Sequence, residues 1–118
     1  MTTIHPPDTL DIIHPYFLNG WKNYEDIYEK AEIFKNKDGL VTINGLITGD
    51  FTKIMFRLPE GWRPQKQLIF TIMSEDNIPR RLDINSNGEL YLNKNGLLGY
   101  ETGNGWVSLS GISFYAKN

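Results

Sequence analysis

The chain has 118 residues and a formal net charge of −2, and its 40% of apolar residues is typical of a globular protein. This length suits one domain, which would bury about two-thirds of the surface of its unfolded chain. The charge argues against a nucleic-acid-binding protein, because phosphate contacts need concentrated lysine and arginine, and the 12 basic residues are scattered. The lack of cysteine excludes disulfides and thiolate metal sites. No apolar run approaches the ~20 residues of a membrane span, so no membrane insertion is expected.

Residues 1–15 contain three prolines and little periodic pattern, so we expect an extended arm or linker before a β domain at residues 16–118. Ile12 and Ile13 are expected to give this arm one anchoring contact. Both histidines of the chain lie in the arm, and their separation matches no standard pair of metal ligands. We therefore predict neither a metal site nor a cofactor.

A turn is predicted at Asn19-Gly20, because glycine accepts a positive φ and asparagine tolerates one. Trp21 is then expected to enter the core. Residues 24–29 fit two interpretations. The apolar side chains in and just beyond them recur at the spacing of an amphipathic helix, yet the chain leads from there directly into a hairpin. We favour a loop at 24–29 followed by a strand at 30–36.

That hairpin turns at Asn36-Lys37-Asp38-Gly39, and residues 40–48 form its returning strand. Val41 and Ile43 alternate with polar residues and therefore share one face of the strand. Asn44-Gly45 interrupts the pattern, which indicates a β-bulge or the close approach of another backbone segment.

The predicted centre of the fold begins with a strand at residues 53–58. Ile54, Phe56 and Leu58 fall on one face of this strand, and Met55 falls on the other. Two prolines and a glycine then impose a corner, since each proline fixes φ and removes a backbone donor.

Trp62 lies at the centre of this corner, and its large ring is expected to be buried. Residues 68–73 are almost unbroken apolar sequence, which predicts a central strand covered on both faces. Ile69 and Met73 face away from the other apolar residues of this strand, so each face needs its own cover. Either a partner subunit covers one face, or a second sheet and the arm cover both.

Residues 75–79 are predicted to form a polar loop, and residues 81–85 and 89–93 a hairpin around Ser86-Asn87-Gly88. This stretch also resembles the first half of a calcium-binding EF-hand loop, with Asp83 at its first position. The final glutamate of such a loop is missing, and the flanking residues alternate as strands do. The hairpin is therefore the favoured interpretation.

Residues 94–105 are the longest turn-rich stretch, and residues 106–117 form the last predicted strand. The apolar side chains of that strand change phase at Ser110-Gly111, which indicates a β-bulge. About seven to nine short strands with turn signals between them predict an all-β fold, a compact antiparallel β-sandwich of jelly-roll-like kind.

No catalytic triad is expected, because both histidines lie in the arm, far from any nucleophile on a strand. Carboxylate pairs of the glycosidase kind have candidates, but 14 acidic residues would supply such candidates by chance in any small domain. We therefore expect a binding protein and not an enzyme.

Loops with aromatic and polar side chains on a rigid β scaffold are typical of surface recognition. Rings stack on sugar faces, while amide, carboxylate and guanidinium groups bind hydroxyls. The predicted saccharide-binding residues are Tyr100, Glu101, Asn104, Asp76, Asn77, Arg80 and Arg81. The alternative is that these residues are ordinary solvated loop positions.

Five segments in this order resemble one family: NGWKNY at 19–24, KNKDGLVTINGLIT at 35–48, FRLPEGWRP at 56–64, LDINSNGELYL at 82–92 and WVSLSGISFYAK at 106–117. The set resembles the C-terminal receptor-binding head domain of tail-fibre and baseplate proteins of phages that infect Gram-positive bacteria. The resemblance covers roughly residues 16–117, and most of the shared residues belong to turns and core. The family often has a tyrosine or another aromatic residue where this chain has Trp62.

The resemblance implies a homotrimeric β-sandwich at the tip of a tail fibre or baseplate, which adheres non-covalently to host cell-wall polysaccharide. Its expected partners are that polysaccharide, further copies of itself and other phage tail or baseplate proteins. It implies a location in the virion after synthesis in the host cytoplasm. Two alternatives stay open: a structural adaptor that docks another tail protein, and, less favoured, a glycan-degrading enzyme.

Overall fold

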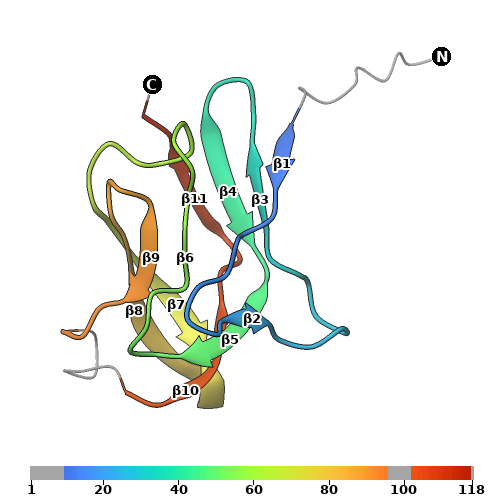
Figure 1. Cartoon of the computed structure of the whole chain (residues 1–118), viewed down its shortest axis with the longest axis vertical. Helices are drawn as coiled ribbons and strands as arrows, with labels where there is room; N and C mark the ends of the chain where they lie inside the picture. The colour runs from blue at the N-terminus through green and yellow to red at the C-terminus, as the bar shows by residue number, and fades with distance from the viewer. Residues whose placement is uncertain (1–9, 96–101, 118) are drawn as a thin grey trace.

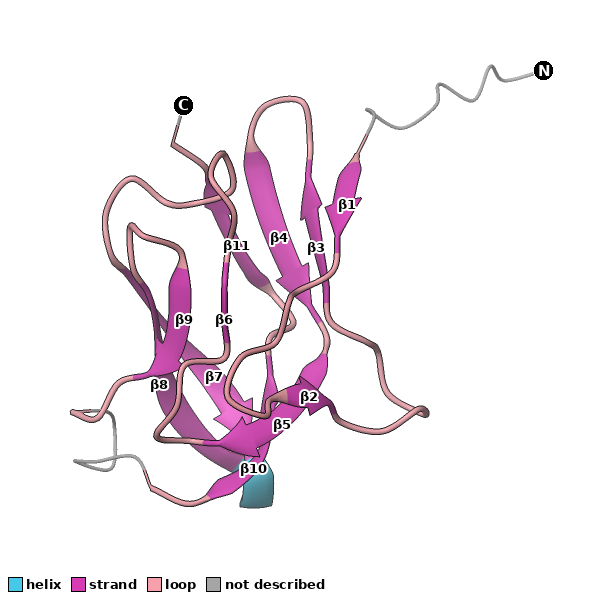
Figure 2. Ribbon diagram, in the orientation of Figure 1, coloured by secondary structure: helices cyan, strands magenta, loops and turns pink. Residues whose placement is uncertain are grey.

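The computed structural model describes residues 10–95 and 102–117, which form antiparallel strands and one short 3-10 helix (Figure 1). The four-stranded sheet has the order β1 (Asp11–Ile13), β3 (Glu32–Lys35), β4 (Leu40–Asn44) and β11 (Ile112–Tyr115). The seven-stranded sheet has the order β2 (Lys22–Asn23), β5 (Leu46–Asp50), β10 (Asn104–Ser108), β7 (Leu68–Ser74), β8 (Ile78–Ile84), β9 (Glu89–Leu92) and β6 (Phe56–Arg57). The predicted all-β, sandwich-like class is confirmed (Figure 2).

The core is built from side chains that alternate with exposed ones along the strands. Val41, Ile43 and Ile47 are each fully buried, and the residues between them along the chain are more exposed, apart from Gly45. Trp21 is 3% exposed, as its place after a turn predicted. Each fully buried aliphatic side chain of this kind contributes about 1.5–3 kcal/mol relative to an exposed position. The alternation therefore fixes which face of each strand points inward.

The loop predicted at residues 24–29 is confirmed, and the helical alternative is wrong. The amide of Tyr28 donates to the carbonyl of Glu25 at 3.0 Å, which closes a single turn before β3 begins at Glu32. The end of the predicted arm pairs with this strand, because Asp11–Ile13 form β1 against β3. Ile13 packs against the core and Ile12 is 50% exposed, so the expected anchoring contact is made by Ile13.

The strand interruptions predicted at Asn44-Gly45 and Ser110-Gly111 lie where the chain crosses from one sheet to the other. Gly45 separates β4 from β5, and residues 109–111 separate β10 from β11. The two crossings lie against each other, since the amide of Leu109 donates to the carbonyl of Gly45 at 2.9 Å. Gly45 has φ 121°, and a Cβ there would lie 2.5 Å from the Cα of Ala31. Only glycine lets the backbone bend at this contact.

The strand predicted at residues 53–58 is shortened to Phe56–Arg57, and Met55 is buried instead of facing outward. Met55 lies between two other segments: its amide donates to the carbonyl of Leu90, and its carbonyl accepts from the amide of Leu18. The predicted inward position of Phe56 and Leu58 is confirmed. The error at Met55 arose because both of its neighbours are distant in sequence.

The corner that follows places Trp62 partly in the core and partly under a lysine. Its ring is half-buried and packs against the core cluster. The Lys35 Nζ lies 4.6 Å from the ring centroid and donates to the carbonyl of Gly61 at 2.8 Å. The expected full burial of Trp62 is therefore only partly correct.

The polar loop predicted at residues 75–79 is shorter than expected. A 3-10 turn at Glu75–Asn77 joins β7 directly to β8, which begins at Ile78. Pro79 pairs with Met73 but lies outside the three residues of β8 that pair with β9, so its missing amide costs no ladder bond on that side. The β8–β9 hairpin has the predicted register, with Leu82 opposite Leu92 and Ile84 opposite Leu90.

Within the described part of the chain only one face of β7 is covered, so these residues do not support the alternative in which a second sheet and the arm cover both faces, and cover by a partner subunit stays a prediction. Ile72 is 6% exposed on the core side, whereas Ile69 and Met73 are 59% and 46% exposed on the other side. The two faces were assigned correctly from the sequence. The covering of the outer one is not supplied by the described residues of this chain.

Candidate ligand-binding face

Strands β2, β5 and β10 present a surface that alternates strictly with the core. Ile47 and Val107 are paired across β5 and β10 and are fully buried, so their neighbours along each strand face outward. Lys22 pairs with Thr48, and Thr48 pairs with Trp106, which places these three side chains in one row. We call the outward surface of these three strands the β2–β5–β10 face.

Two further rows flank this central one on the β2–β5–β10 face. Leu46 pairs with Ser108, and the Tyr24 amide donates to the Leu46 carbonyl at 3.0 Å, which brings Tyr24 to the same row. On the other side, Asp50 pairs with Asn104. The face therefore changes from polar at the Asp50 row to aromatic and apolar at the Leu46 row.

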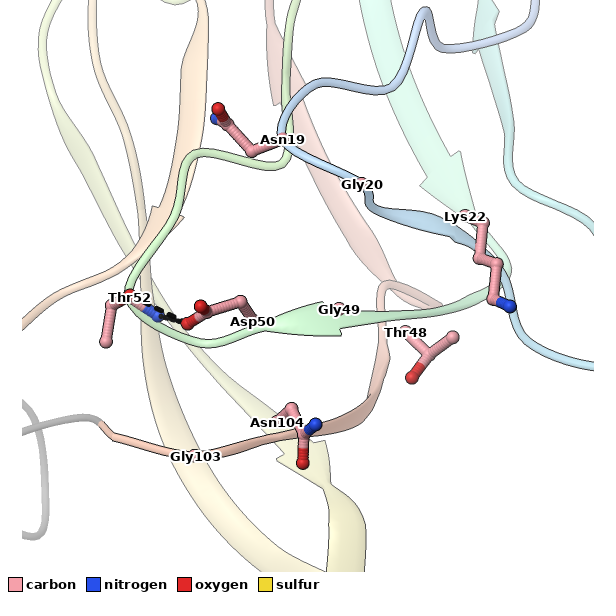
Figure 3. Close-up of a pocket in the computed structure, with 9 residues that line it drawn as sticks. All are labelled: Asn19, Gly20, Lys22, Thr48, Gly49, Asp50, Thr52, Gly103 and Asn104. Atoms are coloured by element: carbon pink, nitrogen blue, oxygen red, sulfur yellow. Dashed lines mark hydrogen bonds between the residues drawn. The ribbon is translucent and has the colours of Figure 1, made fainter.

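An open polar groove occupies the Asp50 side of the face (Figure 3). The residues that line it are Asn19, Gly20, Lys22, Thr48, Gly49, Asp50, Thr52, Gly103 and Asn104. Figure 3 shows the side chains of Thr48 and Asn104 extending to the same side of their strands, whereas Asn19 points away from them. The Asn19 carboxamide donates to the Ile54 carbonyl at 3.0 Å, so its role is to hold the turn.

Asp50 is held in a fixed position within this groove. Its Oδ1 accepts from the Thr52 hydroxyl at 2.7 Å and from the Thr52 amide at 2.8 Å. The hydrogen bond from the Thr52 hydroxyl lowers the pKa of Asp50 below its ordinary value, and the hydrogen bond from the Thr52 amide contributes a smaller effect in the same direction. Asp50 is therefore a carboxylate at neutral pH, and it is the single carboxylate among the described residues that line the groove.

The rigid wall of the groove depends on a close approach between Gly49 and Trp21. A Cβ at Gly49 would overlap the buried indole of Trp21. The indole Nε1 donates to the Lys53 carbonyl at 3.1 Å, and the ring stacks on Phe51 with centroids 6.4 Å apart. The backbone of β5 thus lies directly on a fixed aromatic ring.

A second depression, the aromatic pocket, lies on the other side of the central row. The residues that line it are Tyr24, Tyr28, Leu46, Met73, Trp106 and Ser108. The rings of Tyr24 and Tyr28 are tilted by 40° with centroids 5.5 Å apart. Tyr28 is 46% exposed, and Trp106 is half-buried on the strand. This pocket offers aromatic surface to a ligand without a large rearrangement.

Two carboxylates lie beside the aromatic pocket. Glu75 packs against Gly105, where a Cβ would lie 2.7 Å from both its Cβ and its Oε1, and its Oε1 accepts from the Trp106 amide at 3.4 Å. Partial burial, followed by the negative charges of Glu25 and Glu75, raises the pKa of the Tyr24 phenol above its ordinary value. The pocket therefore lies in a negative local field.

The predicted saccharide-binding residues are dispersed in the structure. Asn104 lines the polar groove, whereas Tyr100 and Glu101 lie outside the described residues. Asp76 and Asn77 are exposed in the turn between β7 and β8 and adopt positive φ values of 62° and 60°. Asn104 is thus the one predicted residue on the β2–β5–β10 face among those described.

The two predicted arginines make internal contacts. Arg80 is 7% exposed, its guanidinium lies 4.4 Å from the Phe51 ring centroid, and its Nε donates to the Ser74 hydroxyl at 2.9 Å. Arg81 donates from Nε and Nη2 to the two carboxylate oxygens of Asp83 at 2.8 and 3.1 Å. These hydrogen bonds raise the pKa of Arg81 further.

Asp83 is fully buried beneath a cap of polar side chains. Besides the Arg81 guanidinium, its Oδ2 accepts from the carboxamides of Asn93, at 3.0 Å, and Gln67. The motif that resembled a calcium loop therefore has its first carboxylate bound internally. Within the described residues no group of three or more His, Asp or Glu side chains could hold a metal ion. In the same part of the chain, no helix is long and apolar enough to cross a membrane.

The sequence interpretation missed the aromatic pocket, although part of its signal was present. Trp106 precedes Val107 in a strand, so alternation alone places the indole opposite the core. Tyr24 and Tyr28 are among the apolar side chains at helical spacing in residues 24–29, and their place in the pocket depends on β2 pairing with β5. No family model, no curated protein and no solved structure matches this chain, so the candidate site is defined by its geometry alone.

Proposed function

We propose that this chain is a receptor-binding domain of a phage tail fibre or baseplate that adheres non-covalently to host cell-wall polysaccharide through its β2–β5–β10 face. One observation carries the proposal: three aromatic rings lie beside hydroxyl, amide and ammonium groups on one side of a sheet. The order of segments that resembles such domains supplies the biological setting. The domain belongs to the virion in this proposal.

The chemistry of the face suits a saccharide chain that runs across the three strands. A sugar ring stacks its CH-rich face on Trp106 or on the tyrosine pair, while Thr48, Ser108 and Asn104 exchange hydrogen bonds with hydroxyls. The sheet positions these groups before binding, which reduces the ordering cost. Each site is shallow and therefore weak, and several copies on one virion raise the overall affinity by multivalency.

The test measures binding to purified Gram-positive cell walls before and after their polysaccharide is stripped. We expect binding only to the unstripped walls, and a loss of about fivefold or more for Trp106→Ala and Tyr28→Ala, because each substitution removes a ring contact of about 1 kcal/mol. Tyr115→Ala is the matched control, since Tyr115 is a 67% exposed aromatic residue on β11 in the other sheet. Equal binding to stripped walls would reject the proposal.

A second candidate function is a structural adaptor that docks another tail protein. The outward side chains Ile69 and Met73 favour it, because exposed apolar residues on a sheet face suit a protein partner. In the receptor-binding proposal, further copies of the chain in a homotrimer cover Ile69, while Met73 lines the aromatic pocket and stays open to the ligand. Wall binding that survives removal of the polysaccharide, or fails on all walls, would favour the adaptor.

A further inference from the structure

The aromatic pocket has a composition that differs from the rest of the β2–β5–β10 face. Three of its six lining residues are aromatic, and one more is a methionine. Among the described residues, none that lines the pocket is basic. Glu75 lies against it through Gly105 and the Trp106 amide. Ring faces and carboxylates are both electron-rich, so both attract cations.

We propose that the aromatic pocket binds an organic ammonium group, and, resting on the function proposed above, that the recognised polysaccharide carries such a group. Ring faces carry a negative quadrupole and bind ammonium cations by cation–π attraction, most strongly at tryptophan. Trp106 supplies one face from β10, and Tyr24 and Tyr28 supply the others from the loop that follows β2. Glu75 supplies the opposite charge.

The local field supports a cation over a neutral or anionic substituent. The charges of Glu25 and Glu75 oppose ionisation of the Tyr24 phenol, and the same charges would repel a phosphate or a uronate placed at the rings. Lys22 is the basic group of the adjoining row, and Thr48 lies between it and Trp106. Lys22 therefore lines the polar groove and not the aromatic pocket, so its positive charge is separated from the rings by Thr48.

The size of the pocket fits a substituent or one sugar unit. Its volume is about 390 Å³, near the lower end of the range for small-molecule sites. The shared chemistry is an ammonium with nearby carbon substituents, and it has two sources in a glycan. One is a primary amine on a sugar ring or an aminoacyl ester, and the other is a quaternary ammonium of choline type.

The decisive experiment compares each cation with its neutral isostere by NMR titration of the full chain. The probes are choline against 3,3-dimethylbutan-1-ol, and glucosamine against glucose. We expect at least one cation to bind about three- to thirtyfold more tightly than its neutral counterpart, with shifts at the Trp106 indole. Equal affinities within both pairs would overturn the inference.

Two variants and one control make the result specific to the pocket. Trp106→Ala removes one ring, and Glu75→Gln removes the charge while it keeps an acceptor for the Trp106 amide. Glu75→Gln should lower cation affinity at least about threefold with an unchanged response to the neutral isostere. Trp106→Ala should lower cation affinity by at least about the same factor and by more than it lowers affinity for the isostere, and Tyr115→Ala should change neither. Cation binding that Glu75→Gln and Trp106→Ala both leave intact would also overturn the inference. A thermal melt of each variant confirms that it is folded.

A second experiment, on purified cell walls, separates this inference from the proposed function. Loss of binding to walls after N-acetylation identifies a primary amine, and retained binding that choline displaces identifies a quaternary ammonium. Retained binding that choline does not displace overturns the inference but leaves polysaccharide recognition intact. Selective cation binding by the chain without any wall binding supports the pocket and rejects the receptor-binding function.

Discussion

Gly49 is a residue at which the candidate face lies directly on the core. Its backbone lies on the buried indole of Trp21, with no room for a Cβ. Gly49→Ala should therefore lower the free energy of unfolding by about 1–3 kcal/mol, as overpacking of a closed core does. Urea denaturation measures this change, and Thr71→Ala at an exposed position of β7 is the control. A loss no larger than that of the control would show that the Trp21 ring can move.

Asp83 is a buried carboxylate whose hydrogen bonds come from three side chains, those of Arg81, Asn93 and Gln67. Asp83→Asn keeps the shape but removes the charge and replaces one acceptor oxygen with an NH2 donor, so the groups that donate to that oxygen lose their partner. We expect a loss of about 1.5–3 kcal/mol in the free energy of unfolding, the range for hydrogen bonds to charged groups. Chemical denaturation at neutral pH tests this value. Asp38→Asn, in the exposed turn between β3 and β4, should change stability little.

At the scale of elements, the pairing of β6 with β9 carries a salt bridge that titrates. The Arg57 Nη2 lies 2.7 Å from the Glu89 Oε2, with 52% and 18% of the two side chains exposed. Hydrogen bonds from Arg57, and then Asn87, lower the pKa of Glu89. A lowered folded-state pKa means that this stabilisation is present above the ordinary glutamate pKa of about 4.3 and is lost as pH falls through the lower folded value.

Glu89→Gln should therefore cost up to about 1 kcal/mol of stability at pH 7 and almost nothing at pH values below the folded pKa of Glu89. The measurement is the free energy of unfolding of both proteins across the acidic range. A difference that stays constant with pH would mean that the carboxylate charge contributes nothing here. High salt should reduce the difference at pH 7, because both groups are partly exposed.

The short β6 also shows why some elements escaped prediction. The alternation of apolar residues correctly predicted that Phe56 and Leu58 are buried, because alternate side chains of a strand lie on the same face. Met55 could not be placed, since its burial depends on backbone contacts with Leu18 and Leu90. The 3-10 turn at Glu75–Asn77 was not predicted because these residues have the polar composition of a loop, and Asp76 and Asn77 adopt the positive φ that such side chains tolerate.

For the whole molecule, the outer face of β7 is the feature that bears on assembly. Ile69 and Met73 are exposed there in the described chain, and a homotrimer of the proposed kind would cover Ile69. Light scattering should then give three times the mass of one chain. Ile69→Lys should shift the mass toward the monomer, whereas Ile12→Lys, at a 50% exposed position of β1 in the other sheet, should not. A monomeric parent chain would reject the trimer while leaving the wall-binding test in place.

The sequence by itself determined the all-β class, most of the turns and the inward face of most strands. These follow from local chemistry: asparagine and glycine accept the turn conformations, and alternation of apolar residues fixes which side is buried. It also located the interruptions at Gly45 and Ser110-Gly111. Only the tertiary structure decided that these interruptions are crossings between two sheets, since that depends on the contact of Leu109 with Gly45.

The candidate face was likewise decided by pairing and not by composition. The sequence predicted Arg81 as a sugar ligand, whereas in the structure its guanidinium donates to the buried Asp83, two residues further along β8. Tyr24, Tyr28 and Trp106 became one pocket only when β2 and β10 paired with β5. Alternation is a property of each strand alone, whereas a site is formed by strands distant in sequence. The choice of neighbours comes from burying the common core, which no short segment encodes by itself.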